Sequence, residues 1–146
     1  MKSLFDEADV HALSQRLAGL SATTAPRWGS FTADRMICHL VDQLDFAFSG
    51  PRDAEVLKGP PMLVRHAIRV FLPWPRGTPT AREMLRTQPD RWASDLATLK
   101  QLMNRFLQSR DWTDWAVHPF FGVLSGAQWA RLAWRHNDHH LRQFGV

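Results

Sequence analysis

Apolar side chains recur at helical spacing along most of this chain, with polar residues between them. The first apolar stripe begins after Ser3, which has an acid three positions later as at many helix starts, and it predicts a helix over about 4–20. The second stripe follows Ser30 and Thr32, either of which can cap a helix, and Gly50–Pro51 ends it. Its apolar members are Met36, Ile37, Leu40, Val41, Leu44 and Phe48.

The middle of the chain lacks this regularity. An apolar stretch dotted with arginine, residues 62–72, can form a short helix, and a rigid crossover loop follows it. The loop residues that restrict the backbone are Pro73, Pro75, Gly77 and Pro79. They lie within residues 50–88, which we expect to form a long connection.

Two further helices complete the pattern. A third long helix is expected over about 89–109, because the proline at its start suits a first helical turn and large apolar residues recur after it. A Trp- and Phe-rich loop over 111–124 then leads to Ser125 and Gln128, which have the spacing of a capping box. This box predicts the start of a fourth helix, which ends at Phe144–Gly145.

Four long helices with no convincing alternating strand predict an all-α fold of the four-helix-bundle kind. The two long connections, 50–88 and 110–125, exclude a simple series of up-down hairpins. The 146 residues are enough for one domain with its own core and too few for two. We therefore expect a single domain over 1–146.

Charge and composition limit the partners. The formal net charge is +4, and Arg outnumbers Lys by fifteen to three, but these residues are interleaved with acids. Nucleic-acid binding is therefore a weak alternative. No apolar run approaches the roughly 20 residues that span a membrane, and the N-terminal residues lack an apolar signal core. The single Cys38 excludes an internal disulfide, so a cytoplasmic protein without a membrane partner is expected.

Three of the seven histidines stand out. His136 and His140 are four residues apart, which on a helix places both imidazoles on one face, where they can hold one metal ion. His39 lies on the apolar stripe of the second helix and reaches the same level if the second and fourth helices pack antiparallel. Because buried imidazoles need partners, these three residues predict a metal site.

The neighbouring residues have other predicted roles. His118 precedes the fourth helix, and ten helical residues separate it by roughly 15 Å from the level of His136, so we interpret it as a structural loop residue. His139 could support the site or be exposed, and Cys38 is expected to be a buried, unreactive thiol.

Four polar residues near the three histidines could hold a ligand or orient a substrate. They are Asp42, Gln43, Asp138 and Gln143. The two acids could equally be surface charges. No Ser-His-Asp or Cys-His pattern stands out, so the sequence names no further catalytic residue.

Several short motifs occur in a recognisable order. They are Trp28-Gly29, Met36-Ile37-Cys38-His39, Thr78-Pro79-Thr80, His118-Pro119-Phe120-Phe121-Gly122, Trp129 and His136-Asn137-Asp138-His139-His140-Leu141-Arg142-Gln143-Phe144. In these motifs the chain resembles the DinB/YfiT-like superfamily, bacterial four-helix bundles with a three-histidine metal site. The likeness spans nearly the whole chain and is greatest to an uncharacterised branch of that superfamily.

The resemblance implies a ligand set and a range of reactions. The ligands would be His39 from the second helix and His136 and His140 from the fourth, with a long crossover between the second and third helices. Characterised members of the superfamily include thiol-dependent S-transferases and a mycothiol-dependent isomerase, and many others are described as metal-dependent hydrolases.

A three-histidine site would suit catalysis, since it leaves a metal ion at least one open position. Imidazole suits several metals, and we expect divalent zinc or nickel, which would activate a bound water or thiol. The leading hypothesis is an S-transferase or hydrolase with a small-molecule substrate or a low-molecular-weight thiol, acting as a homodimer. The alternative is a non-catalytic helical bundle, with or without metal, that acts as a binding protein.

Overall fold

The computed structural model describes residues 1–70, 72 and 80–146, so the crossover residues Pro73, Pro75, Gly77 and Pro79 lie outside the described part. Within that part the chain is all-helical, with five α-helices, one short 3-10 helix and no strand. The helices are α1 (Glu7–Leu17), α2 (Ala33–Ser49), α3 (Met62–Val70), η1 (Arg82–Met84), α4 (Trp92–Leu107) and α5 (Gly126–Gln143). The predicted all-α class is therefore confirmed.

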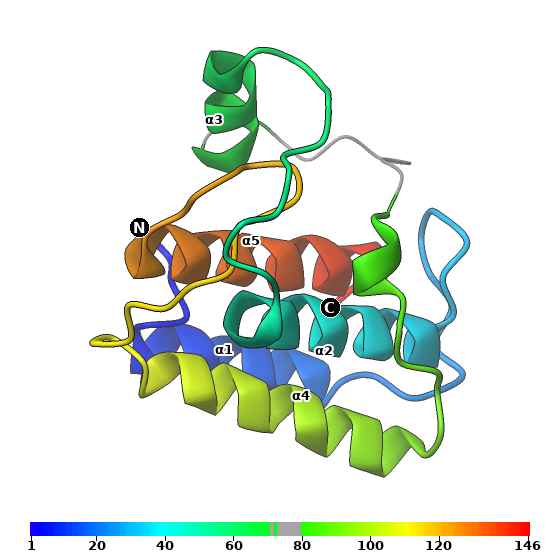
Figure 1. Ribbon diagram of the computed structural model, residues 1–146. Coiled ribbons are helices and arrows are strands. Elements are labelled where there is room, and N and C mark those ends of the chain that lie inside the picture. Colours follow the sequence, from blue (N-terminus) through cyan, green and yellow to red (C-terminus); the bar gives the residue numbers. More distant parts are fainter. Residues whose placement is uncertain (71, 73–79) are drawn as a thin grey trace.

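Helices α1, α2, α4 and α5 form the body of the molecule. They lie side by side as a bundle, in which α2 packs against α4 and α5, and α1 packs against the same two helices (Figure 1). The colours of Figure 1 show that α2 and α5 run in opposite directions. Helix α3 stands outside the bundle, beyond α5 in this view. The antiparallel pairing of α2 and α5 decides where the candidate site lies.

Local capping contacts set the helix boundaries. Helix α1 begins later than predicted because Asp6 is its N-cap, with a carboxylate that accepts from the Asp9 amide at 3.1 Å. Helix α4 also begins later than its predicted proline start, since Arg91 still has an extended backbone and the helix opens at Trp92. Both differences shift an end by a few residues and leave the helices in their predicted order.

The predicted capping box of α5 is confirmed. Ser125 Oγ accepts from the Gln128 amide at 3.3 Å, and Gln128 Oε1 accepts from the Ser125 amide at 2.9 Å. The next residue, Trp129, is fully buried, and its Nε1 donates to the Ala116 carbonyl oxygen at 3.1 Å. This contact ties the start of α5 to the loop before it. The other large, fully buried side chains are Phe106, Leu4, Leu13, Leu17, Met36, Ile37, Leu40, Leu44, Leu99, Met103 and Leu132.

Helix α3 is attached through arginines. The buried guanidinium of Arg65 donates three hydrogen bonds to backbone carbonyl oxygens. The acceptors are Leu57, Pro60 and Phe120. From the bundle, Arg135 of α5 donates to the carbonyl oxygen of Arg69 at 2.5 Å. None of the helices in the described residues has the length and apolar composition that a membrane crossing requires.

Candidate metal centre

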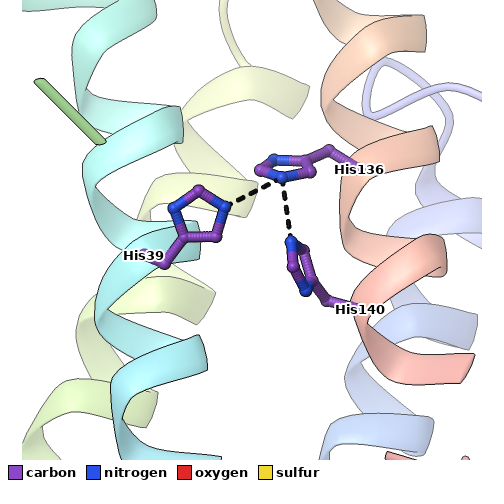
Figure 2. Close-up of side chains that lie close together, drawn as sticks. All are labelled: His39, His136 and His140. Atoms are coloured by element: carbon purple, nitrogen blue, oxygen red, sulfur yellow. Dashed lines mark hydrogen bonds between the residues drawn. The ribbon is translucent and has the colours of Figure 1, made fainter. Parts of the chain in front are cut away.

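Three histidine side chains meet between α2 and α5. His39 comes from α2, and His136 and His140 come from α5 (Figure 2). Nε2 of His136 lies 3.0 Å from Nε2 of His39 and 3.0 Å from Nε2 of His140. The three residues are buried, with exposed fractions of 4%, 6% and 8% in chain order. The antiparallel packing thus brings them to one level as predicted, and the cluster could hold a metal ion.

A backbone carbonyl fixes the ring of His39. The Met84 oxygen lies 2.9 Å from Nδ1 of His39. A carbonyl oxygen only accepts hydrogen bonds, so Nδ1 carries the proton of the neutral ring. Nε2 of His39 therefore presents a lone pair toward His136.

The segment that carries Met84 is attached to one face of α2 by side-chain hydrogen bonds. Arg35 donates to carbonyl oxygens of this segment, including that of Thr87. Asp42 accepts from the Thr87 amide at 2.9 Å and from the Thr87 hydroxyl at 2.5 Å. Arg35, His39 and Asp42 are spaced so that they share one side of the helix. The segment is therefore fastened to α2 on both sides of the His39 contact.

A side-chain amide fixes the ring of His140. Gln143 Nε2 donates to the Trp28 carbonyl oxygen at 2.7 Å, which turns Gln143 Oε1 toward Nδ1 of His140 at 2.8 Å. Nδ1 of His140 therefore carries the proton, and its Nε2 presents a lone pair toward His136. Gly29 follows Trp28 with a φ of +79°, and a Cβ there would lie 2.5 Å from the Gln143 amide nitrogen. Only glycine allows this close approach.

A shared cation fits this set of donors. His39 and His140 both present lone pairs to Nε2 of His136, which carries at most one proton and cannot donate to both. Imidazole nitrogens about 2.0–2.1 Å from a tetrahedral zinc ion lie about 3.3 Å apart, close to the 3.0 Å separations here. Burial lowers the pKa of all three rings, that of His140 to about 3, so they are neutral as metal ligands must be.

The three histidines line a cavity of about 760 Å³. Small-molecule sites commonly have volumes of about 300–1,000 Å³. Much of the wall is aromatic or aliphatic, and the ring of Phe31 packs 5.3 Å from that of His39 and 5.9 Å from that of His140. The charged wall residues, Arg82 and Glu83, are exposed to solvent. The inner wall is therefore mainly apolar, with neutral polar groups set into it.

The two acidic candidates form no hydrogen bond with the three histidines in the part of the chain that the structure describes. Asp138 pairs with Arg16 of α1 at 2.7 Å and with Arg142 at 3.0 Å. It follows His136 by two positions, about 200° around the helix, so its carboxylate faces α1. Asp42 is buried, and its carboxylate accepts hydrogen bonds from Thr87 in the segment attached to α2. Among the described residues, neither carboxylate accepts a hydrogen bond from a histidine.

Two other candidates line the cavity. Gln43 is 3% exposed, and neither of its amide atoms has a hydrogen-bond partner among the described residues. One prediction for Gln43 is that it holds a histidine nitrogen, and it makes no such hydrogen bond here. His139 also lines the cavity, with its ring 6.1 Å from that of Trp28 in an edge contact. Gln143 is thus the one polar candidate among the described residues that directly orients a predicted ligand.

His118 has its predicted structural role but lies nearer the site than predicted. Its Nδ1 accepts from the backbone amides of Phe120 at 3.0 Å and Phe121 at 3.2 Å. It also lines the cavity, and after burial and the closer histidines it helps to lower the pKa of His136. It is not one of the three clustered histidines, as the helical rise predicts. The loop turns back along α5, where the His118 ring packs 5.2 Å from that of Trp129.

The contacts of Met84 and Phe31 with the histidines were not predicted, whereas the burial of the Cys38 thiol was. The Met84 carbonyl belongs to an irregular segment, where no side-chain pattern indicates which backbone oxygen turns inward. Phe31 was not singled out, although it directly precedes Thr32, one of the two predicted caps of α2. Cys38 is buried, and burial raises the pKa of its thiol to about 11, which keeps it protonated.

Comparison with known proteins gives a family. A family profile described as "Protein of unknown function (DUF1569)" matches residues 4–145. The chain belongs to this DUF1569 family. The match covers every residue that builds the cluster and the cavity. No curated protein and no solved structure matches the chain. The family description names no reaction, so a function for this DUF1569 protein must be argued from its geometry.

The amide of Gln143 provides a first prediction for the DUF1569 chain. Replacing Gln143 by leucine is expected to weaken zinc binding about 10–100-fold, because His140 loses the acceptor that fixes its tautomer. Competition with a chromophoric chelator measures this affinity. Gln101→Leu, at an exposed position of α4, is the matched control and should bind as the unmodified chain does. Equal affinities of the two variants would contradict the role of Gln143.

The unpartnered amide of Gln43 provides a second prediction. Replacing Gln43 by methionine, which has a similar shape, is expected to raise the free energy of unfolding by about 1–2 kcal/mol. The gain arises because a buried amide without a partner is removed. Urea unfolding of the ligand-free protein measures the change, with Gln101→Met as the exposed control. A loss of stability in Gln43→Met would mean that the amide is satisfied in solution.

Proposed function

We propose that this DUF1569 protein is a metal-dependent enzyme of the DinB/YfiT-like type. In this proposal His39, His136 and His140 hold one divalent ion, zinc or nickel. The reaction is transfer of a thiol or hydrolysis by water, with a small molecule as substrate. The observation that supports it is the convergence of three buried Nε2 atoms on the wall of a cavity large enough for such a molecule.

The arrangement of helices supports the superfamily part of the proposal. The long helices form a bundle, and an extended connection that carries α3 and η1 separates α2 from α4. The histidines come from α2 and from the last helix, which is the distribution that the resemblance implies. Cytoplasmic location and a homodimeric state remain predictions within this proposal.

The protein's own residues would prepare the site for chemistry. When bound, the ion supplies a Lewis acid that lowers the pKa of a coordinated water or thiol. The three rings are neutral and would leave its charge undiminished, and a site with three protein ligands would keep at least one coordination position for a water or substrate. The Met84 carbonyl and the Gln143 amide hold two of the rings in the required tautomer. The apolar wall limits the water that can compete with a substrate.

Metal titration tests the proposal directly. Chelator-treated protein is expected to bind one Co²⁺ or Zn²⁺ per chain, and the visible bands of Co²⁺ report the coordination number. Addition of 2-mercaptoethanol is expected to produce a near-ultraviolet thiolate-to-cobalt band if a thiol enters the open position. His11→Ala, on the exposed side of α1, is the control. Binding of less than one ion per chain, or a closed site that admits neither thiol nor water, would overturn the proposal and favour a non-catalytic bundle.

A further inference from the structure

The cavity wall contains a tightly formed turn that the metal centre does not use. His118 and Gly122 exchange two backbone hydrogen bonds of 2.9 Å, and Gly122 closes the turn with a φ of +75°. Inside the turn, Nδ1 of His118 accepts from the amides of Phe120 and Phe121. The imidazole ring is therefore held by two backbone amides inside a turn that two further backbone hydrogen bonds close, and it cannot turn freely.

These contacts determine the tautomer of His118. Backbone amides only donate, so Nδ1 is the acceptor and the ring proton lies on Nε2. Among the described residues Nε2 has no hydrogen-bond partner, although the ring lines the cavity. Burial lowers the pKa of His118 to about 3, so the ring is neutral and keeps this arrangement at physiological pH. The turn thus holds a fixed N–H donor at the cavity wall.

We propose that the Nε2–H of His118 binds a carbonyl oxygen of a ligand in the cavity, and that this ligand is an uncharged, largely apolar molecule. A neutral N–H donates to any oxygen acceptor, and the wall has no buried counter-charge for an anion, which favours a neutral acceptor such as a carbonyl oxygen. Histidine 118 is then a ligand-contacting residue as well as the centre of its turn.

The walls support an uncharged, apolar ligand. The residues around the site include Trp28, Phe31, Ile68, Phe120 and Leu132. Burying an ionised group against such a surface without a paired charge is costly. The charged residues of the wall, Arg82 and Glu83, are both exposed, so they do not provide a buried counter-charge.

The side chain of Gln43 is a second and independent case of a polar group without a hydrogen-bond partner among the described residues that line the cavity. Its buried amide has an acceptor and two donors without partners among the described residues. Polar groups that a protein leaves unsatisfied beside a cavity are a common feature of binding sites.

The position of His118 connects this ligand to the proposed reaction. His118 is close enough to contribute, after burial and the closer histidines, to the lowered pKa of His136. A carbonyl held there would be the electrophile for the activated thiol or water, and in this respect the inference rests on the proposed function. Binding of the carbonyl compound itself requires no metal ion, so the two ideas can fail separately.

The experiment compares two molecules of nearly equal shape. 2-Acetylnaphthalene carries a carbonyl group, and 2-isopropenylnaphthalene replaces its oxygen with a CH₂ group. Equilibrium dialysis against chelator-treated protein measures both dissociation constants. The chain is expected to prefer the ketone about 5–10-fold, the effect of one neutral hydrogen bond whose donor is otherwise left unpaired. Equal binding of the two molecules, or binding of neither, would overturn the inference.

Two variants assign the preference to His118. In His118→Asn the side-chain oxygen can replace Nδ1 as acceptor for the turn, but the N–H at the Nε2 position is lost. Ketone binding should then fall to the level of the alkene, whose unchanged binding shows that the cavity is intact. His118→Gln places an amide N–H near the Nε2 position and should retain part of the preference. A full preference in folded His118→Asn would refute the assignment, and Zn²⁺ titration of the same samples tests the metal centre separately.

Discussion

Replacing His136 by phenylalanine is expected to lower the affinity of the chain for Zn²⁺ by about 10³-fold or more. This exceeds the roughly 10–100-fold loss typical when a residue behind a metal ligand is removed. Nε2 of His136 lies 3.0 Å from the Nε2 atoms of both other histidines, so its loss removes the central one of three donors and leaves two. Phenylalanine keeps an aromatic ring of similar volume in a buried position, so the fold should survive.

Competition with a chromophoric chelator measures the loss, and far-ultraviolet circular dichroism checks the helical content. His11→Phe, at an exposed position of α1, is the matched control and should bind one ion per chain with full affinity. Tight binding of one ion by folded His136→Phe would place the metal at another site. It would also remove the main support for the proposed enzyme.

Acidification of the metal-free chain from pH 6.5 toward pH 3 is expected to cause a large loss of stability. Burial lowers the pKa of His118 and of His140 from 6.5 to about 3, and it lowers those of His39 and His136 as well. Between pH 6.5 and 3 the unfolded chain binds protons that the folded chain does not bind. The contribution of these histidines to the free energy of unfolding is therefore fully present above pH 6.5, and it is lost as the pH decreases through this window.

The expected loss of stability is comparable in size with the total stability of a typical domain. Each such histidine contributes about 1.4 kcal/mol per pH unit below 6.5. His118 and His140 together give about 3 kcal/mol per unit, against total stabilities of about 5–15 kcal/mol for typical domains. The chain should therefore lose much of its stability by about pH 4.5.

Urea unfolding at several pH values between 7 and 4.5 measures this dependence. His140→Phe removes one of the titrating groups and should make the dependence shallower, whereas Gln101→Leu, at an exposed position without a titrating group, should leave it unchanged. A free energy of unfolding that stays constant from pH 6.5 to 4.5 would contradict the buried, neutral state of these rings.

The sequence was sufficient to predict the cluster of three histidines, because its geometry depends on regular helices. The spacing of His136 and His140 needs only one helix, and the position of His39 needs only the antiparallel packing of two apolar stripes. Both requirements are met by α2 and α5. Helical angle could also have separated Gln143 from Asp138, because Gln143 is three positions from His140 whereas Asp138 is about 200° from His136.

The contacts that irregular segments provide could not be predicted in this way. The partner of His39 is the carbonyl of Met84, and every residue has such a carbonyl. The position of His118 in the cavity wall depends on the path of an irregular loop, which the rise of a helix does not describe. The same limit applies to the start of α1, where Asp6 rather than Ser3 accepts the capping hydrogen bond.

The contact between His39 and Met84 connects the position of the cavity wall with the orientation of a candidate metal ligand. Met84 belongs to η1, and residues 80–84 form part of the cavity wall. A bulky guest that pushes this wall outward must also stretch the hydrogen bond that sets the orientation of the His39 ring. The size of the guest would then be sensed at the metal ligand, so discrimination between substrates could act on the reactivity of the ion as well as on the fit of the cavity.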